Sequence, residues 1–291
     1  MFYIIIALLI WASSFTAGKY AYTMFDPAIA IQIRFFIASL IVLPFFLKTH
    51  KTLSQPIKKS LWGIAFLMFP IGILMQFMGL AYTSASSAVV IIGTEPILVL
   101  IVGFLLFKQK VAIYDWILSL IALLGIVLLV LGSNDDGAVN LFGLLLVFLA
   151  GAGFALSIHS SKSLMAQMDN KVYTSALLVK GAILSLPISL FLVKDWTIHF
   201  NWLGLFSVIY LGVCCSFVAY KLWNIGLNKT PAHISGMLIA LEPVFGVLIA
   251  FVFLGERMSL LTALGSVLVI GSAILSTVIP ILKEKRQKAT N

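Results

Sequence analysis

The chain has 291 residues, of which 62% are hydrophobic and only 10% are charged, and its mean hydropathy is +1.13. Soluble domains are about half apolar and a quarter charged, so this composition excludes an ordinary soluble fold and indicates a protein embedded in a bilayer. The formal net charge of +9 suits the anionic inner surface of a membrane and is no evidence for a nucleic-acid partner.

Ten apolar runs follow one another along the chain, each long enough to cross a hydrocarbon layer of about 30 Å as a helix. They are Phe2 to Gly18, Ala28 to Leu47, Leu61 to Ala81, Ala85 to Phe107, Ile113 to Leu131, Leu141 to Ser160, Tyr173 to Val193, Trp202 to Tyr220, Ile234 to Leu254 and Leu260 to Leu282. The first run lacks a basic start and a small-residue cleavage site, so we expect it to remain as a span. The sequence therefore predicts an all-α membrane protein with ten transmembrane helices.

The basic residues are distributed unevenly between the two sides of this arrangement. With a cytoplasmic N-terminus, Lys19, Lys194 and Arg257 lie on the outer side, and Arg34 and Lys180 lie inside spans. The other fourteen lie on the inner side: Lys48, Lys51, Lys58, Lys59, Lys108, Lys110, Lys162, Lys171, Lys221, Lys229, Lys283, Lys285, Arg286 and Lys288. Because basic residues favour the cytoplasmic side, we expect both termini there, with residues 283–291 as a basic tail.

The second half of the chain repeats the first. Glu95-Pro96 recurs as Glu242-Pro243 at an offset of 147 residues, and the Gly-Leu, Thr and Ala before it recur at the same offset. The polar interruption Ser133 to Asn140 separates five spans from five, and an odd number of spans places the two copies in opposite orientations. We therefore expect two inverted repeats, residues 1–133 and 141–282.

Glu95 and Glu242 lie near the middle of their spans, about 13 to 15 Å deep at 1.5 Å per residue. An ionised carboxylate there costs at least about 2.5 kcal/mol, and a group that loads and releases a proton is the simplest coupling device. Pro96 and Pro243 each remove an amide donor and so mark an irregular, hydratable point in the helix. Two interpretations remain open. The acids either couple transport to protons or contact substrate, or they are protonated structural linkers beside a packing kink.

Two segments also resemble a known family. Trp11-Ala12-Ser13-Ser14-Phe15, followed by Lys19, Pro27 and Arg34, looks like the opening of the EamA-type permeases of the drug/metabolite transporter superfamily, and Leu241-Glu242-Pro243-Val244-Phe245 with Leu254-Gly255-Glu256-Arg257 resembles that family's ninth span and its outer end. The resemblance implies inverted repeats around a central cavity and export or exchange of small metabolites, such as amino acids, in a bacterial inner membrane. One departure is that the first half has Lys108-Gln109-Lys110 where the second has Gly255-Glu256-Arg257.

The remaining candidates are polar and aromatic residues within the spans. Arg34 and Lys180 either extend their long side chains to the interface or pair with the glutamates or a substrate carboxylate, and Arg34 matches the family's usual arginine. Residues that we expect to line a cavity of mixed character are Trp11, Ser14, Gln76, Phe154, Ser157, Tyr220, Trp223 and Asn224. Tyr220 and Trp223 are alternatively interfacial anchors, and the two serines alternatively backbone-bonded packing residues. His159 is more typical of a solvated or capped histidine than of a proton relay. No metal-ligand spacing occurs, and no cofactor is expected.

These features together predict a secondary transporter rather than an enzyme. A substrate would bind between the halves and be exposed to each side in turn, with H+ as the coupling ion. A passive facilitator or a lipid flippase of the same superfamily remains the alternative, and a membrane-embedded enzyme is a distant third because no hydrolase or metalloprotease motif occurs. The partners expected are a small-molecule substrate and the lipid bilayer, and the chain is either a monomer or a weak homodimer.

Overall fold

The computed structural model describes residues 1–83, 85–132, 140–254 and 259–290. In these ranges all the regular structure is helical, and no β-strand occurs. Eight helical stretches are long and apolar enough to cross a membrane. The predicted outer-end motif Gly255-Glu256-Arg257 lies outside the described residues.

The first half contains seven α-helices and two other helical segments. Their bounds are α1 Phe2–Tyr22, α2 Pro27–Thr49, η1 His50–Thr52, α3 Gln55–Phe66, η2 Leu67–Leu74, α4 Met75–Tyr82, α5 Ala85–Ile92, α6 Glu95–Leu105 and α7 Ile113–Leu131. The segments α3, η2 and α4 form one span, Gln55–Tyr82, with a π-helical middle.

The second half has a similar order of elements. Its bounds are α8 Leu141–Met165, α9 Asn170–Leu192, α10 Trp202–Tyr210, η3 Leu211–Val218, α11 Ala219–Lys229, α12 Ala232–Ile239, α13 Leu241–Leu254 and α14 Leu260–Thr290. The segments α10, η3 and α11 again form one span, Trp202–Lys229, with a π-helical middle.

Short polar side chains start several of the long helices. Asp26 caps α2, Asn140 caps α8, Asp169 caps α9 and Asn201 caps α10, each by accepting a hydrogen bond from a backbone amide in the first turn. An amide at a helix start has no partner within the helix, so these caps satisfy donors that the membrane interior would leave unpaired. Polar caps between apolar runs therefore set where spans begin.

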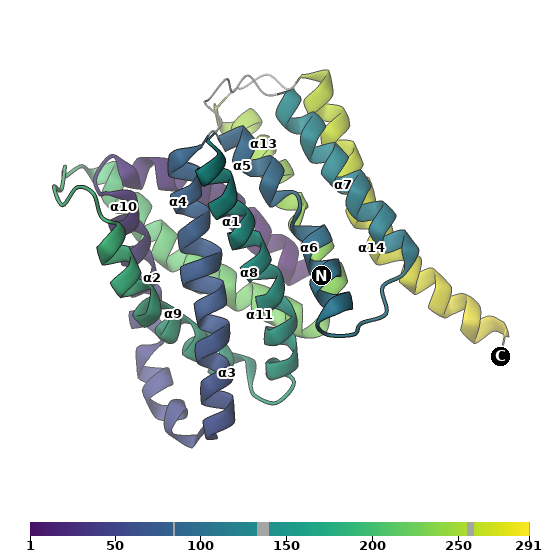
Figure 1. Cartoon of the computed structure of the whole chain (residues 1–291), viewed down its shortest axis with the longest axis horizontal. Coiled ribbons are helices and arrows are strands. Elements are labelled where there is room, and N and C mark those ends of the chain that lie inside the picture. Colours follow the sequence, from purple (N-terminus) through teal and green to yellow (C-terminus); the bar gives the residue numbers. More distant parts are fainter. Residues whose placement is uncertain (84, 133–139, 255–258, 291) are drawn as a thin grey trace.

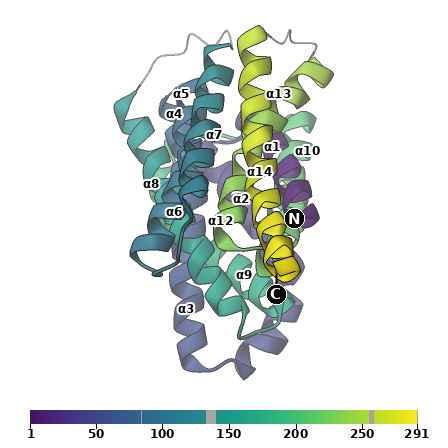
Figure 2. The ribbon, with the colours of Figure 1, turned by 90° about the vertical axis from the view of Figure 1, so that its right-hand side faces the viewer.

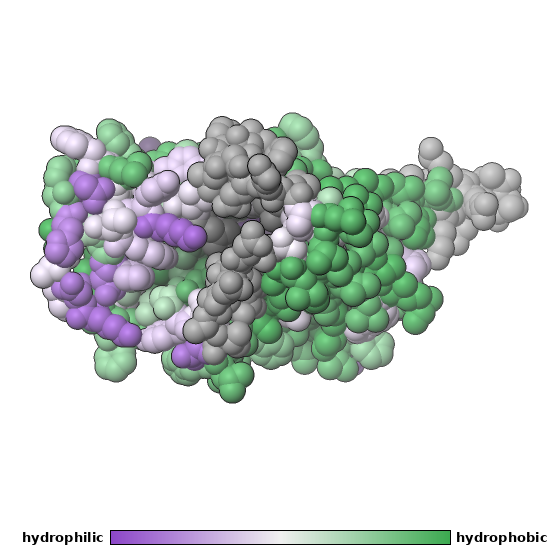
Figure 3. Space-filling model, turned by 90° about the horizontal axis from the view of Figure 1, so that it is seen from above, coloured by the Kyte–Doolittle hydropathy of each residue, from purple (hydrophilic) through white to green (hydrophobic). Residues whose placement is uncertain are grey.

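Helices of one half pack mainly against helices of the other. The pairs are α1 with α11, α2 with α9, α4 with α8, and α7 with α14. The α7–α14 pair stands at one side of the bundle, as both ribbon views show (Figures 1 and 2). From above, hydrophobic residues cover this side, and hydrophilic residues gather at the opposite end, where α2, α9 and α10 lie (Figure 3). A broad apolar side is what a helix pair facing lipid requires.

Two of the predicted spans are not continuous helices. The run Ala85 to Phe107 is broken between α5 and α6, and the run Ile234 to Leu254 is broken at Ala240, between α12 and α13. The helices before the breaks end at Ile92 and Ile239, the two residues whose carbonyls lose an amide partner to Pro96 and Pro243. The Glu-Pro pairs predict an irregular point in each helix, and the structure shows a full helix break at both places.

Some other predicted bounds were also wrong by several residues. The first helix continues to Tyr22, the third span starts at Gln55 rather than Leu61, and α8 continues to Met165. Polar residues such as Lys19, Lys58 and Lys162 sit within these extra turns. Hydropathy alone marks the apolar part of a helix and not its polar ends, which is why the prediction stopped short.

Candidate substrate pocket

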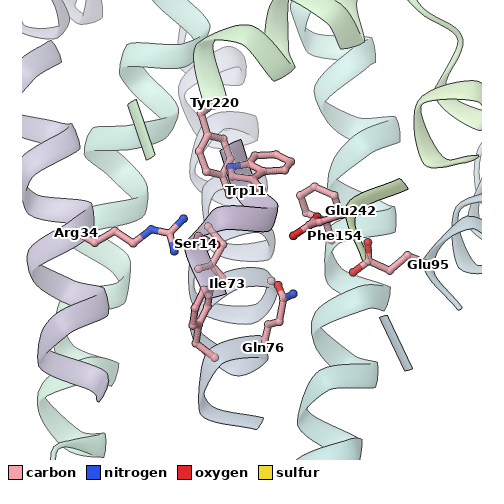
Figure 4. A pocket seen from close by; sticks show the side chains of 11 residues that line it. Trp11, Ser14, Arg34, Ile73, Gln76, Glu95, Phe154, Tyr220 and Glu242 are labelled. Atoms are coloured by element: carbon pink, nitrogen blue, oxygen red, sulfur yellow. The ribbon is translucent and has the colours of Figure 1, made fainter. Parts of the chain in front are cut away.

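A small cavity lies where the two broken helices meet the π-helical spans. It has a volume of about 50 Å³, room for a few water molecules, and is lined by Trp11, Ser14, Arg34, Gly72, Ile73, Gln76, Phe77, Glu95, Phe154, Tyr220 and Glu242. These residues come from α1, α2, η2, α4, α6, α8, α11 and α13, so both halves of the chain contribute (Figure 4).

The two glutamates occupy equivalent places on the two broken helices. Glu95 is in the first turn of α6 and Glu242 is in the first turn of α13. Helix starts present free amides and a partial positive charge, which favour a carboxylate. The two carboxyl groups lie close together on one side of the pocket (Figure 4). Close approach of α8 helps to confine Glu95, because a Cβ atom on Gly151 would lie 3.2 Å from the Glu95 Cγ atom.

Arg34 faces these acids from the opposite side of the pocket (Figure 4). Its side chain is buried, with 2% of its area exposed, so it does not extend to the membrane interface. The Nε atom donates a hydrogen bond of 2.7 Å to Ser216 Oγ, and the guanidinium carbon lies 5.3 Å from the centre of the Phe77 ring. Its Nη1 atom is buried without a hydrogen-bond partner among the described residues. One edge of the guanidinium is therefore free to bind an anion.

Aromatic rings form the wall between Arg34 and the glutamates. Trp11 lies 5.1 Å from Tyr220 and 6.2 Å from Phe154, measured between ring centroids, and its Nε1 atom donates a 2.9 Å hydrogen bond to the Cys215 carbonyl. Trp223 packs 5.3 Å behind Trp11 without lining the cavity. Tyr220 and Trp223 are both buried inside the bundle, so the alternative of interfacial anchoring was wrong for them.

Three other predicted residues lie away from the cavity. Ser157 is fully buried and donates a 2.7 Å hydrogen bond to the Phe154 carbonyl. Asn224 donates a 3.0 Å hydrogen bond to Thr174 Oγ1, which joins α11 to α9. Lys180 is buried and lies against the Trp62 ring. The structure therefore brings together Trp11, Ser14, Arg34, Gln76, Phe154, Tyr220 and the two glutamates, but not Ser157, Lys180, Trp223 or Asn224.

His159 is neither solvated nor at a helix cap. Its Nε2 atom lies 2.8 Å from the Val99 carbonyl, and its ring stacks on Phe107 with centroids 5.0 Å apart. It thus joins α8 to α6 and to the segment that follows α6. The predicted solvated or capped position was wrong because a neighbouring helix covers this part of α8.

The sequence interpretation missed four residues at or beside the cavity. Gly72, Ile73 and Phe77 line it on the same helical face as Gln76, and Ser216 holds Arg34 from behind. An α-helix repeats every 3.6 residues, so Gln76 could have indicated positions 72 and 73, but not Phe77, which directly follows it in the chain. Ser216 gave no such signal, because its partner lies 182 positions away in the sequence.

Comparisons with known proteins agree with this architecture. The model of the EamA-like transporter family matches residues 1–131 and 141–278. An uncharacterized transporter of Archaeoglobus fulgidus is 26% identical over 92% of this chain and 95% of its own length. The uncharacterized transporter YetK of Bacillus subtilis is 26% identical over 97% of this chain and 87% of its own length.

A solved structure also shares the fold. It aligns with a TM-score of 0.80 at 19% identity and covers 96% of both chains. At that identity the likeness supports the fold alone, whereas the family model matches most of the sequence. The chain therefore belongs to the EamA-like transporter family and is a membrane transporter of the drug/metabolite type.

Proposed function

We propose that the chain is a secondary transporter that exports or exchanges small zwitterionic metabolites, with amino acids as the specific class. The single observation behind this proposal is the pocket that has Arg34 on one side and Glu95 and Glu242 on the other. A guanidinium with a free Nη1 atom suits a carboxylate, and carboxyl groups on the far side suit an ammonium. The aromatic wall between them suits the apolar part of such a molecule.

The proposed topology has ten spans in two inverted repeats, residues 1–133 and 141–282, with both termini and the basic tail 283–291 in the cytoplasm of a bacterial cell. In this topology the pairs α5–α6 and α12–α13 are the fourth and ninth spans. The matching order of π-helical spans and broken helices in the two halves supports the duplication. Broken helices at the centre of inverted repeats are typical of binding sites in secondary transporters.

Transport would proceed by alternating access around this pocket. A cavity of about 50 Å³ does not hold an amino acid, so the lining helices must separate before a substrate enters. Glu95 and Glu242 are proposed to take up a proton on one side of the membrane and release it on the other. Two adjacent acids suit this role, because a bound proton relieves the repulsion between them and the cost of their burial.

A counterflow screen in proteoliposomes tests the substrate class and the mode of transport together. We expect exchange of one or more amino acids and a response of net transport to an imposed pH gradient. Gln in place of Glu95 and Glu242 should remove that response. Asp169→Asn is the matched control, because Asn also caps helices well and this residue lies outside the pocket. Transport that is unaffected by the Gln substitutions, in a parent protein without pH dependence, would favour a passive facilitator. Movement of labelled phospholipid in place of amino acids would favour a flippase.

A further inference from the structure

Lys180 is a basic residue buried inside the protein, and the transport pocket does not use it. Its side chain has no exposed area, and its Nζ atom lies 3.7 Å from the centre of the Trp62 ring. The ring attracts the cation, but it does not replace the acceptors that three ammonium protons require. Among the described residues, Nζ has no hydrogen-bond partner. Burying such donors is costly unless an acceptor from outside the chain satisfies them.

Two further basic side chains surround this position. Lys58 lies one turn before Trp62 on the same face of α3, and His50, which follows α2, experiences the positive charge of both Lys180 and Lys58. The Nδ1 atom of His50 is also buried without a hydrogen-bond partner. The acid at the start of α9, Asp169, caps that helix by accepting from backbone amides. The cluster therefore has an excess of positive charge and of unused donors.

We propose that Lys180, Lys58 and His50 form a binding site for a phosphate group, carried by an anionic phospholipid or present as free phosphate. The proposal rests on the orientation given above, which places the cluster on the cytoplasmic side. Anionic lipids gather there, and basic pockets between transmembrane helices on that side bind their headgroups. Trp62, with 38% of its area exposed, covers the Lys180 ammonium. Rotation of this one side chain would open the ammonium to a headgroup.

Lipid binding to the purified full-length protein tests the site. Native mass spectrometry would compare phosphatidylglycerol, which is anionic, with phosphatidylcholine, which has no net charge. We expect Lys180→Met and Lys58→Met each to weaken phosphatidylglycerol binding by about tenfold, the size of one lost charge-assisted hydrogen bond. Lys59→Met is the matched control, because Lys59 is exposed and lies beside Lys58 on another face of α3. Its effect should be less than about twofold, and Lys180→Arg should retain binding.

The outcomes separate the two sources of phosphate. Thermal stabilisation of the wild type by inorganic phosphate, lost in Lys58→Met, would support the site with a free anion as its ligand. Equal phosphatidylglycerol binding in Lys58→Met and Lys59→Met, without any effect of inorganic phosphate, would overturn the proposal. Lys58 is only half-buried, so we expect Lys58→Met to fold. Comparison of Lys58→Met with Lys59→Met therefore tests the proposed site even if Lys180→Met does not fold. Binding is measured without transport, so its failure is distinct from a failure of the proposed transport function.

Discussion

Arg34 and Ser216 show how one hydrogen bond can orient a binding group. Ser216 accepts a hydrogen bond from the Nε atom, and Nη1 has no hydrogen-bond partner among the described residues. The serine comes from a π-helical segment of the second half, whereas Arg34 lies on α2 of the first. A guanidinium held in this way presents a fixed planar edge, which a lysine cannot reproduce.

Replacing Arg34 by Lys is therefore expected to raise the KM for a zwitterionic substrate by about tenfold, and replacing it by Met by more. Ser216→Ala should cause a smaller increase, because the guanidinium remains but loses its orientation. The measurement is the concentration dependence of exchange in proteoliposomes. Lys48→Met, at the inner end of the same helix, serves as a control with an unchanged KM. An Arg34→Met protein with the wild-type KM would show that the guanidinium does not bind substrate.

A glycine contact between α4 and α8 provides a prediction of stability. A Cβ atom on Gly79 would lie 2.6 Å from the Val147 Cγ2 atom and 2.7 Å from the Gly143 carbonyl oxygen, so one of the helices must move. Gly79→Ala should cost about 1 to 3 kcal/mol and lower the melting temperature. Gly63→Ala on α3, where the added carbon meets open space, should leave the melting temperature unchanged or raise it slightly, because alanine favours helix. Similar melting curves for the two variants would contradict the close packing of α4 against α8.

At the scale of elements, the broken helices distinguish the site from the rest of the bundle. Pro44 and Pro187 lie inside α2 and α9, which continue through them, whereas Pro96 follows directly after a break. A proline alone therefore does not end a helix in this protein. The break at Pro96 coincides with a buried acid whose place at a helix start depends on it.

Pro96→Ala would return an amide donor to the Ile92 carbonyl and favour one continuous helix. We expect the exchange rate to fall, because Glu95 would no longer lie at a helix start. Thermal stability should be kept or increased, because the helix becomes more regular. Rates and melting temperatures of the same preparation test this. Pro44→Ala, away from the cavity, is the control and should change the rate little. Full exchange activity in Pro96→Ala would show that the break is only a packing feature.

The elements were predictable from the sequence to different degrees. Apolar runs predicted the spans, and the Glu-Pro pairs predicted where two of them are irregular, because both effects act locally along the chain. The π-helical segments Leu67–Leu74 and Leu211–Val218 were not predicted, because hydropathy does not distinguish them from α-helix. The burial of Trp223 and the position of Lys180 were also beyond prediction, since each depends on which distant helix packs against it.

For the whole molecule, the distribution of basic residues predicts the orientation. Fusion of green fluorescent protein to the C-terminus should give fluorescent cells, because that protein matures in the cytoplasm. Alkaline phosphatase inserted after Thr197, in the segment between α9 and α10, should be active outside the membrane. The same enzyme inserted after Gln167, between α8 and α9, is the control and should be inactive. The reverse pattern of activity would contradict cytoplasmic termini.

The pairing of helices across the two halves has a consequence for how the protein is built. Four packed helix pairs join residues before position 133 to residues after position 140: α1–α11, α2–α9, α4–α8 and α7–α14. Neither half alone could form these four helix pairs, because each pair needs one helix from the other half. Two separately synthesised fragments should consequently find each other in the bilayer and reconstitute an active pair, much as subunits of a heterodimer do.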